Sequence, residues 1–297
     1  MQERSMKQGT LIRGIGSFYT VREEQGTEYT LRCKKKFRRE KKTPLVGDEV
    51  LFTPGTGEEH GWIECILERK NEFIRPPVSN ITQLVLVLAP VPETDFLLAD
   101  RMIARAFSQG IKVVIAVNKA DMDSGMAGRV REQYAAAGIP VIGVSAASGD
   151  GLDELKELLM GETNCLAGQS GAGKSSLLNA MLGLQRETGE ISERINRGKN
   201  TTRTVELLEK DGIRIMDTAG FNLLEPEKGL DPKKLKERYP EFLPYEGKCR
   251  FRECLHNREP GCAVYQAAEE GLVSKERLER YRVLLDETRA EWENRYQ

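Results

Sequence analysis

The first 75 residues alternate short apolar runs with breaks at glycine, proline or charge. The runs at residues 10–23, 27–37, 48–54 and 62–70 are rich in the residue types that strands prefer. Several short strands within about 70 residues predict a small β-barrel, and an OB-type barrel is one candidate. The segment Arg75–Asn80, RPPVSN, is typical of a linker.

From residue 81 to about 221 the pattern changes to continuous apolar runs alternating with helical spacing. The apolar runs lie at 82–89, 111–118, 139–146 and 162–168, and the helical segments at 96–110, 128–138 and 151–161. Residues 204–220 then contain two strands around Asp211-Gly212, a hairpin turn signal. Strands without alternation are buried on both faces, so this layout predicts a doubly wound α/β domain.

Beyond about residue 225 the chain becomes helical and charged around a Cys/His cluster. The sequence therefore predicts three domains, at 1–75, 76–224 and 225–297. Apolar residues are 39% and charged residues 31% of the 297 positions, and the net charge is −1. We expect a globular cytoplasmic protein without a membrane partner, since no signal peptide or 20-residue apolar stretch is present and the six cysteines suit a reducing compartment. We also expect a monomer.

Residues 168–175, GQSGAGKS, match the phosphate-binding pattern G-x-x-x-x-G-K-[ST] in full. The loop follows a predicted strand and opens a predicted helix, so its backbone N–H groups would face phosphates. Lys174 would reach the terminal phosphates, and the Ser175 hydroxyl would bind magnesium. The expected nucleotide contacts are Gly168, Gln169, Ser170, Gly171, Ala172, Gly173, Lys174, Ser175 and Ser176.

Asn118-Lys119-Ala120-Asp121 follows a predicted buried strand. The Asp121 carboxylate can accept from the ring N–H and the exocyclic amino group of guanine, a pair that adenine does not present. Lys119 can lay its stem along the base, and Asn118 can brace the loop. One β-unit later, a backbone N–H of Ser145-Ala146-Ala147 can bind the guanine exocyclic oxygen. Together these residues predict a guanine site.

Two further segments have the character of nucleotide switches. Asp217 begins D-T-A-G after a predicted strand; its carboxylate would hold magnesium through water, and the Gly220 N–H would contact the terminal phosphate. Thr201 or Thr202 would complete the magnesium shell. The order base loop, SAA, phosphate loop, threonine pair, DTAG is a rotation of the usual GTPase order. Such a rotation preserves a fold when the original termini are close, so we predict a circularly permuted GTPase domain that binds GTP or GDP.

Cys249, Cys254, His256 and Cys262 lie within fourteen positions. Three thiolates and one imidazole suit a closed tetrahedral site, so we predict one structural zinc. The spacing differs from that of a standard zinc finger, and the alternative is a helical region that carries reduced cysteines by chance.

The tract 32–42, RCKKKFRREKK, holds eight cations and one acid around Phe37. RNA phosphates would be attracted to such a patch, and a base can stack on an exposed Phe37. The alternative is a solvated loop of the barrel.

At these motifs the chain resembles the ribosome small-subunit-dependent GTPase A family, the RsgA/YjeQ type of circularly permuted GTPase. The resemblance covers nearly the whole chain and implies an OB-type barrel, a permuted P-loop GTPase domain and a C-terminal α-helical zinc-binding subdomain. It also implies a GTP hydrolase that binds the small ribosomal subunit and its rRNA late in assembly and is stimulated by that subunit.

Two residues near the predicted switch segments differ from those common in such GTPases. Many GTPases place a water-orienting Gln directly after DTAG, whereas this chain has Phe221, and the His common in the family before the Thr pair is Asn200 here. Slow intrinsic hydrolysis is therefore expected. Two alternatives stay open: a GTP-regulated rRNA-binding protein with negligible turnover, and a metabolic P-loop enzyme, which the guanine motifs disfavour.

Overall fold

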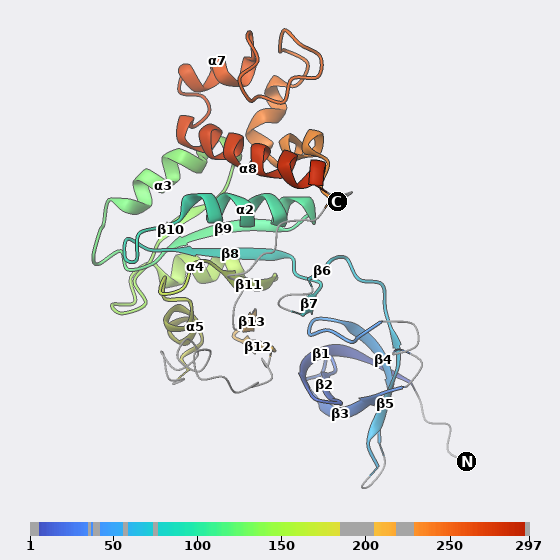
Figure 1. Ribbon diagram of the computed structural model, residues 1–297. Helices are drawn as coiled ribbons and strands as arrows, with labels where there is room; N and C mark the ends of the chain where they lie inside the picture. Colours follow the sequence, from blue (N-terminus) through green and yellow to red (C-terminus); the bar gives the residue numbers. More distant parts are fainter. Residues whose placement is uncertain are drawn as a thin grey trace. The chain divides into compact units, whose positions relative to one another are not determined.

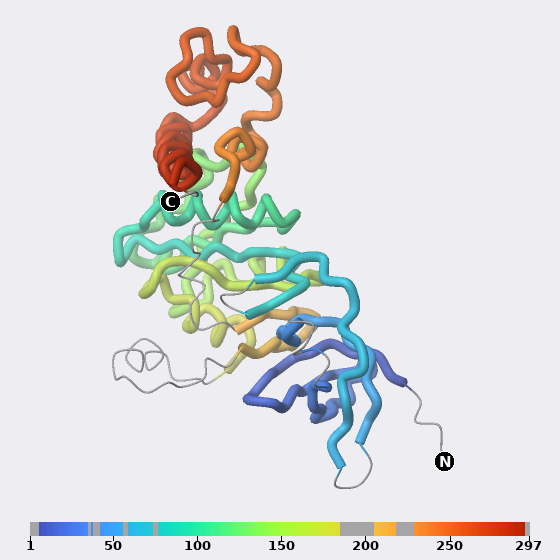
Figure 2. The backbone as a smooth tube through the Cα atoms, turned by 45° about the vertical axis from the view of Figure 1, so that its right-hand side comes forward, coloured from blue at the N-terminus to red at the C-terminus, as the bar shows by residue number. Residues whose placement is uncertain are grey.

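The computed structural model describes residues 6–34, 37, 42–55, 59–73, 77–184, 205–217 and 229–294. The backbone is drawn in two views in Figures 1 and 2. The chain forms two compact units. One comprises Met1–Gln83, Leu159–Leu166 and Glu187–Phe221, and the other Leu84–Leu158, Ala167–Arg186 and Asn222–Gln297.

Five strands in the first unit form the predicted barrel. They are β1 (Lys7–Ile15), β2 (Phe18–Arg22), β3 (Glu28–Cys33), β4 (Glu49–Thr53) and β5 (Gly61–Ile66). They follow each other in the order β1-β2-β3-β5-β4, and β4 also pairs with β1, which closes the sheet. Leu11, Val21, Leu31, Phe52 and Ile63 are fully buried, so the interior is filled by side chains of all five strands.

The segment expected to be a linker is partly structured. Val78 and Ser79 form β7 (Val78–Ser79), which pairs with β6 (Glu72–Phe73), and both residues are fully buried. The Ser79 hydroxyl donates to the buried Asp48 carboxylate at 2.7 Å, and Asp48 also accepts from Arg69 at 2.7 Å. The linker prediction is therefore wrong for residues 77–80, because long-range polar contacts hold them against the barrel.

The first unit also contains three strands from later in the chain: β11 (Thr163–Ala167), β12 (Glu206–Lys210) and β13 (Ile213–Asp217). β13 pairs in parallel with β11 and antiparallel with β12, and β12 pairs with β1 at Arg13 and Glu206. Asp211 and Gly212 have φ angles of 52° and 80°, as a tight hairpin turn requires. The hairpin prediction is confirmed.

The second unit contains β8 (Gln83–Leu88), β9 (Lys112–Val117) and β10 (Val141–Gly143), neighbours in one sheet. The helices that connect or follow them are α2 (Phe96–Ser108), α3 (Met126–Tyr134) with the short η1 (Ala135–Ala137), α4 (Leu152–Leu159) and α5 (Lys174–Leu182). Figure 1 shows α2 and α4 on opposite faces of these strands. Every residue of β8 is buried, as expected for a strand covered on both faces.

The C-terminal part of the second unit is helical, as predicted. It consists of η3 (Pro232–Arg238), η4 (Pro240–Tyr245), α7 (Ala263–Glu269) and α8 (Lys275–Glu293). Its core stacks Tyr239 on Phe242 at 5.1 Å between ring centroids, and both rings pack edge-on against Tyr281. Among the helices that the structure describes, none is both long and apolar enough to cross a membrane.

Candidate nucleotide and metal sites

Asn118 joins the base-reading loop to the phosphate loop. It lies directly after β9 and is 2% exposed. Its Nδ2 donates to the Ala172 carbonyl at 3.0 Å, and its Oδ1 accepts from the Ala146 backbone N–H at 3.1 Å. The Asn118 side chain therefore connects its own loop to the phosphate loop and to the loop at residues 145–147. This is the bracing role that the sequence predicted for Asn118.

Lys119 and Gln169 attach the phosphate loop to the segment between β8 and α2. Lys119 has a φ of 61°, and its ammonium donates to the carbonyls of Val91 at 2.7 Å and Gly171 at 2.9 Å. The Gln169 Nε2 donates to the Glu93 carbonyl at 2.8 Å. The Gln169 side chain is thus bound to protein groups, so the predicted contact of Gln169 with a nucleotide would be made by its backbone.

Two glycines allow this close approach of the loops. Gly173 has a φ of +91°, and a Cβ there would lie 2.3 Å from Asn118 Nδ2. Gly168 has a φ of +134°, and a Cβ would lie 2.2 Å from the Val87 carbonyl oxygen. Both positions combine a left-handed backbone with no room for a side chain, so glycine is required at each.

Lys174 lies at the first position of α5 and donates to the carbonyls of Gly168 at 2.7 Å and Gln169 at 2.9 Å. Burial lowers its pKa to about 8. The ammonium therefore lies within the concave backbone of the phosphate loop, where a polyphosphate would supply the negative charge that the free site lacks.

The Asp121 carboxylate is exposed and accepts from the Ser145 hydroxyl at 2.6 Å. The buried Ser145 thereby orients the carboxylate predicted to read guanine. The Ala146 N–H, predicted as a contact to the base, already donates to Asn118.

Of the residues predicted to bind magnesium, the structure describes Ser175 and Asp217. Ser175 is exposed in the first turn of α5, and its hydroxyl is the kind of oxygen donor that magnesium takes. Asp217 ends β13 in the other unit. Thr201, Thr202 and Gly220, together with Asn200 and Phe221, lie outside the described residues.

The four predicted zinc ligands lie together. The Sγ atoms of Cys249, Cys254 and Cys262 are 3.6, 3.6 and 3.4 Å from His256 Nδ1, and all four ligand atoms lie within 4.8 Å of one another. A tetrahedral zinc with ordinary bond lengths separates sulfur and nitrogen by about 3.6 Å. The donor set and its dimensions therefore fit zinc.

Backbone N–H groups also point at the sulfurs. The amides of Ala263, His256 and Tyr265 donate to Cys249, Cys254 and Cys262 at 3.3, 3.4 and 3.5 Å. Such contacts orient metal ligands and stabilise thiolates. Burial raises the pKa of Cys254 and Cys262 and lowers that of His256 to about 4, so a bound cation would favour the thiolate forms of Cys254 and Cys262.

The structure corrects one expectation about RNA. Phe37 is 4% exposed, so its ring packs inside the protein and cannot stack on a base. Of the surrounding cations, Arg32 lies over the Phe18 ring at 4.8 Å and Lys34 pairs with Glu64. Residues 35–36 and 38–41 lie outside the described part of the chain.

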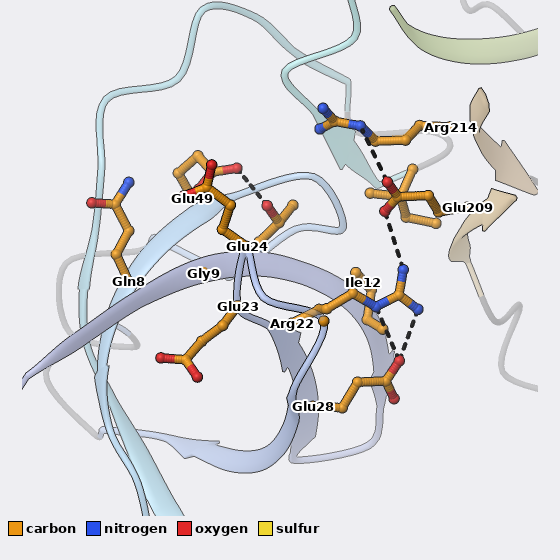
Figure 3. Close-up of a pocket in the computed structure, with 13 residues that line it drawn as sticks. Gln8, Gly9, Ile12, Arg22, Glu23, Glu24, Glu28, Glu49, Glu209 and Arg214 are labelled. Carbon is orange, nitrogen blue, oxygen red and sulfur yellow. Dashed lines mark hydrogen bonds and ion pairs between the residues drawn. The ribbon is translucent and has the colours of Figure 1, made fainter. Parts of the chain in front are cut away.

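A hollow of about 830 Å³ lies between the barrel and the β12–β13 hairpin, within the first unit. Figure 3 shows carboxylates around it, with Arg22 and Arg214 both paired to Glu209. Its ionisable lining residues are Glu23, Glu24, Glu28, Glu49 and Glu209 against Arg22 and Arg214. The excess of carboxylates repels a triphosphate, so this hollow is not the nucleotide site.

The sequence motifs did not reveal a buried charge cluster in the second unit. Asp100 and Arg277 are 0% and 2% exposed and form an ion pair, and Arg277 also pairs with the buried Glu241. The only sign of this cluster in the sequence was Asp100, a charged residue on the apolar face of the predicted helix 96–110. Its partner lies 177 positions away, a separation that periodicity does not bridge.

Two family models match the chain: the RsgA N-terminal domain over residues 8–63 and the RsgA GTPase over residues 66–227. The chain is 42% identical over 282 residues to the small ribosomal subunit biogenesis GTPase RsgA of Ruminiclostridium cellulolyticum, covering 93% of this chain and 92% of that protein. The protein of the same name from Geobacillus thermodenitrificans is 44% identical, with 93% and 95% covered.

Solved structures agree with these sequence relatives. YjeQ from Thermotoga maritima superposes with a TM-score of 0.80 at 33% identity, covering 96% of this chain and 99% of that one. YloQ, described as a circularly permuted GTPase, has a TM-score of 0.78 at 30% identity, with 98% of each chain covered. The permuted order of motifs, the five-stranded barrel and these matches together show that the chain belongs to the RsgA GTPase family.

Proposed function

We propose that this chain is a GTPase of small ribosomal subunit biogenesis, which hydrolyses GTP to GDP and phosphate and is stimulated by the subunit. The observation that carries the proposal is the Asn118 side chain, which joins the base-reading loop to the phosphate loop at 3.0 Å. That contact supports the proposal because it joins the loop that carries Asp121, the proposed guanine-reading carboxylate, to the proposed phosphate-binding loop. Kinases with a phosphate loop alone lack such an arrangement.

Each nucleotide contact has a chemical role. Asp121 accepts from the guanine ring N–H and amino group, and the stem of Lys119 lies along the base. The backbone of residues 168–173 and the N-terminus of α5 donate to phosphate oxygens. Lys174 neutralises charge on the terminal phosphates. Positioning and charge stabilisation are then the main sources of catalysis.

Magnesium would be held by Ser175, Asp217 and one of Thr201 and Thr202, with Gly220 donating its N–H to the γ-phosphate. When bound, the ion supplies positive charge to the β- and γ-phosphate oxygens. The residues Phe221 and Asn200 offer no general base for the attacking water. Intrinsic hydrolysis is therefore slow, and the small subunit orders the site for attack.

The appended regions position the enzyme on its partner. The barrel contacts rRNA, and its basic tract at 32–42 contributes phosphate contacts without base stacking by Phe37. Zinc bound by Cys249, Cys254, His256 and Cys262 is structural and holds the loops between η4 and α7. We place the protein in the cytoplasm as a monomer, with functional segments 1–75, 76–224 and 225–297.

The test is phosphate release by the purified protein with GTP or ATP, with and without small ribosomal subunits. The proposal expects a rate that rises with the subunit for GTP only. A rate near zero in all four mixtures, combined with tight GTP binding, would instead favour a GTP-regulated rRNA-binding protein. Equal use of ATP would contradict the guanine assignment.

A further inference from the structure

Helix α2 begins at a contact with the phosphate loop. Its N-cap residue Asp95 accepts from the Leu98 N–H at 2.9 Å, which starts the helix. The Asp95 backbone N–H donates to Gln169 Oε1 at 2.9 Å, while Gln169 Nε2 donates to the Glu93 carbonyl at 2.8 Å. Both ends of one amide side chain therefore fix the start of α2 to the second residue of the phosphate loop.

The middle of α2 is fixed to α8. Asp100 lies five residues after the N-cap, about 7.5 Å along the helix axis, and is fully buried. Its carboxylate pairs with Arg277 and Arg280 of α8 and accepts from the Tyr134 hydroxyl at 2.8 Å. Separating α2 from α8 would leave buried charges without partners, which is strongly unfavourable.

Other contacts also join α2 to α8. Arg101 pairs with Glu287 at 2.8 Å. Leu97 and Ala104 of α2 pack on the aromatic core around Tyr281, and Figure 1 shows α8 next to α2. The helix is thus a continuous hydrogen-bonded body that starts at the phosphate loop and contacts the C-terminal helices through residues 97–104.

We propose that α2 couples the nucleotide site to the C-terminal helical region, with Gln169, Asp100 and Arg280 as positioning residues. A displacement of α8 changes the affinity for nucleotide phosphates, because it alters how Gln169 holds the phosphate loop. Because coupling between two sites is reciprocal, nucleotide binding changes the equilibrium constant for the contact between α2 and α8 by the same factor as the contact changes nucleotide affinity. The inference rests on the proposed nucleotide site and adds its regulation.

The opposing interpretation is that these contacts only hold the fold together. The two interpretations differ in additivity. If α2 transmits the effect, removing Arg280 acts through Gln169, so its effect on nucleotide affinity disappears once Gln169 is gone. If the contacts are independent structural supports, the two effects multiply, as distant sites normally do.

The experiment is a double-mutant cycle on the full chain, with Kd measured for GDP and a non-hydrolysable GTP analogue. The variants are Arg280→Ala, Gln169→Ala and the pair. Arg289→Ala is the control, because Arg289 is also on α8 but forms its ion pair with Asp286 of the same helix. We expect about fivefold weaker binding in each single variant and no further loss in the pair. Arg280→Lys, which keeps the charge, restores part of the affinity.

Wild-type affinity in Arg280→Ala, or effects that multiply in the pair, would overturn the coupling. Thermal unfolding checks that each variant is folded, and Arg101→Ala replaces Arg280→Ala in the cycle if the latter is not. A wild-type protein that binds neither nucleotide would refute the proposed nucleotide site itself. A failure of the coupling and a failure of the site are therefore distinguishable.

Discussion

Asn118 and Asp121 lie in the same loop but differ in burial and in hydrogen-bond partners. Asn118 is buried, and both ends of its amide bind protein groups, the Ala172 carbonyl and the Ala146 N–H. Asp121 is exposed and has one described partner, the Ser145 hydroxyl. The first residue therefore shapes the site, and the second remains available to a base.

Lys174 gives the nucleotide site a pH dependence. Burial lowers its pKa to about 8 in the free protein, and bound phosphates raise it again because they favour the charged form. Below about pH 8 the amine is protonated before and after binding, so GTP affinity is constant there. Above about pH 8 the site must take up a proton to bind, and affinity falls by up to about tenfold per pH unit.

Titration calorimetry between pH 7 and 9 measures this slope. GMP is the matched ligand, because it carries the same base but lacks the terminal phosphates that we propose Lys174 contacts. We expect GMP affinity to change little over this range. Identical slopes for GTP and GMP would show that Lys174 does not control the effect.

Gly173 tests the packing between the loops. The substitution Gly173→Ala places a methyl group 2.3 Å from Asn118 Nδ2 at a φ of +91°. We expect GTP affinity to fall by at least about tenfold, since the phosphate loop or Asn118 must shift. Gly138→Ala is the matched control, with a φ of +66° and nothing within 4 Å of the added carbon. Normal GTP binding by Gly173→Ala would contradict the described loop contact.

Among the elements, we expect the loops that carry the Cys/His cluster to be stabilised by a bound zinc ion. Four candidate ligand atoms lie within 4.8 Å of one another, on residues between η4 and α7. Cys262→Ser should weaken zinc binding by more than about 100-fold, since loss of an outer-shell partner alone costs about 10- to 100-fold. Competition with a metal-binding dye measures the affinity.

The control for this substitution is Cys65→Ser, which changes an exposed free thiol on β5. It should leave zinc content and thermal stability as in the wild type. A purified wild-type protein that holds one zinc per chain, and a Cys262→Ser protein that also holds it tightly, would together exclude Cys262 as a ligand.

Local patterns predicted most of the elements in both units. Continuous apolar runs identified β8 and β9, and Asp211-Gly212 identified the β12–β13 hairpin, because these signals act between near neighbours. Residues 77–80 were expected to be a linker, yet Ser79 is buried on Asp48, 31 positions away. Phe37 was likewise expected to be accessible to a base, because its sequence neighbours are basic and basic residues usually lie at the surface. Its burial depends on tertiary contacts that neighbouring residue types do not reveal.

The candidate site was predictable where a motif encodes chemistry. Residue type and spacing predicted a cluster of Cys249, Cys254, His256 and Cys262, and the structure brings their ligand atoms within 4.8 Å of one another. They also predicted one site from the loops at 118–121 and 168–175, which a hydrogen bond from Asn118 joins. The Gln169 side-chain contact with residues 93–95 was not predicted, since any polar residue fits that position of the pattern. The same holds for Asp100, whose partners on α8 become neighbours only through the tertiary fold.

For the whole molecule, the order of motifs distinguishes this chain from an ordinary GTPase. The base loop precedes the phosphate loop by about 50 residues along the chain, yet Asn118 and Ala172 are hydrogen-bonded. A circular permutation keeps such contacts because the fold depends on packing and not on where the chain begins. The permuted chain can therefore perform GTPase chemistry with its motifs in rotated order.

The most direct test of the central claim changes the base specificity and measures hydrolysis on the ribosomal subunit. In Asp121→Asn, the carboxylate that reads the guanine amino group becomes an amide that can pair with the carbonyl of xanthine. We predict that this variant loses subunit-stimulated hydrolysis of GTP by at least about 100-fold and regains it with xanthosine triphosphate, which the wild type does not use. Retained GTP hydrolysis by Asp121→Asn, or no subunit-stimulated hydrolysis with either nucleotide in either protein, would contradict the account.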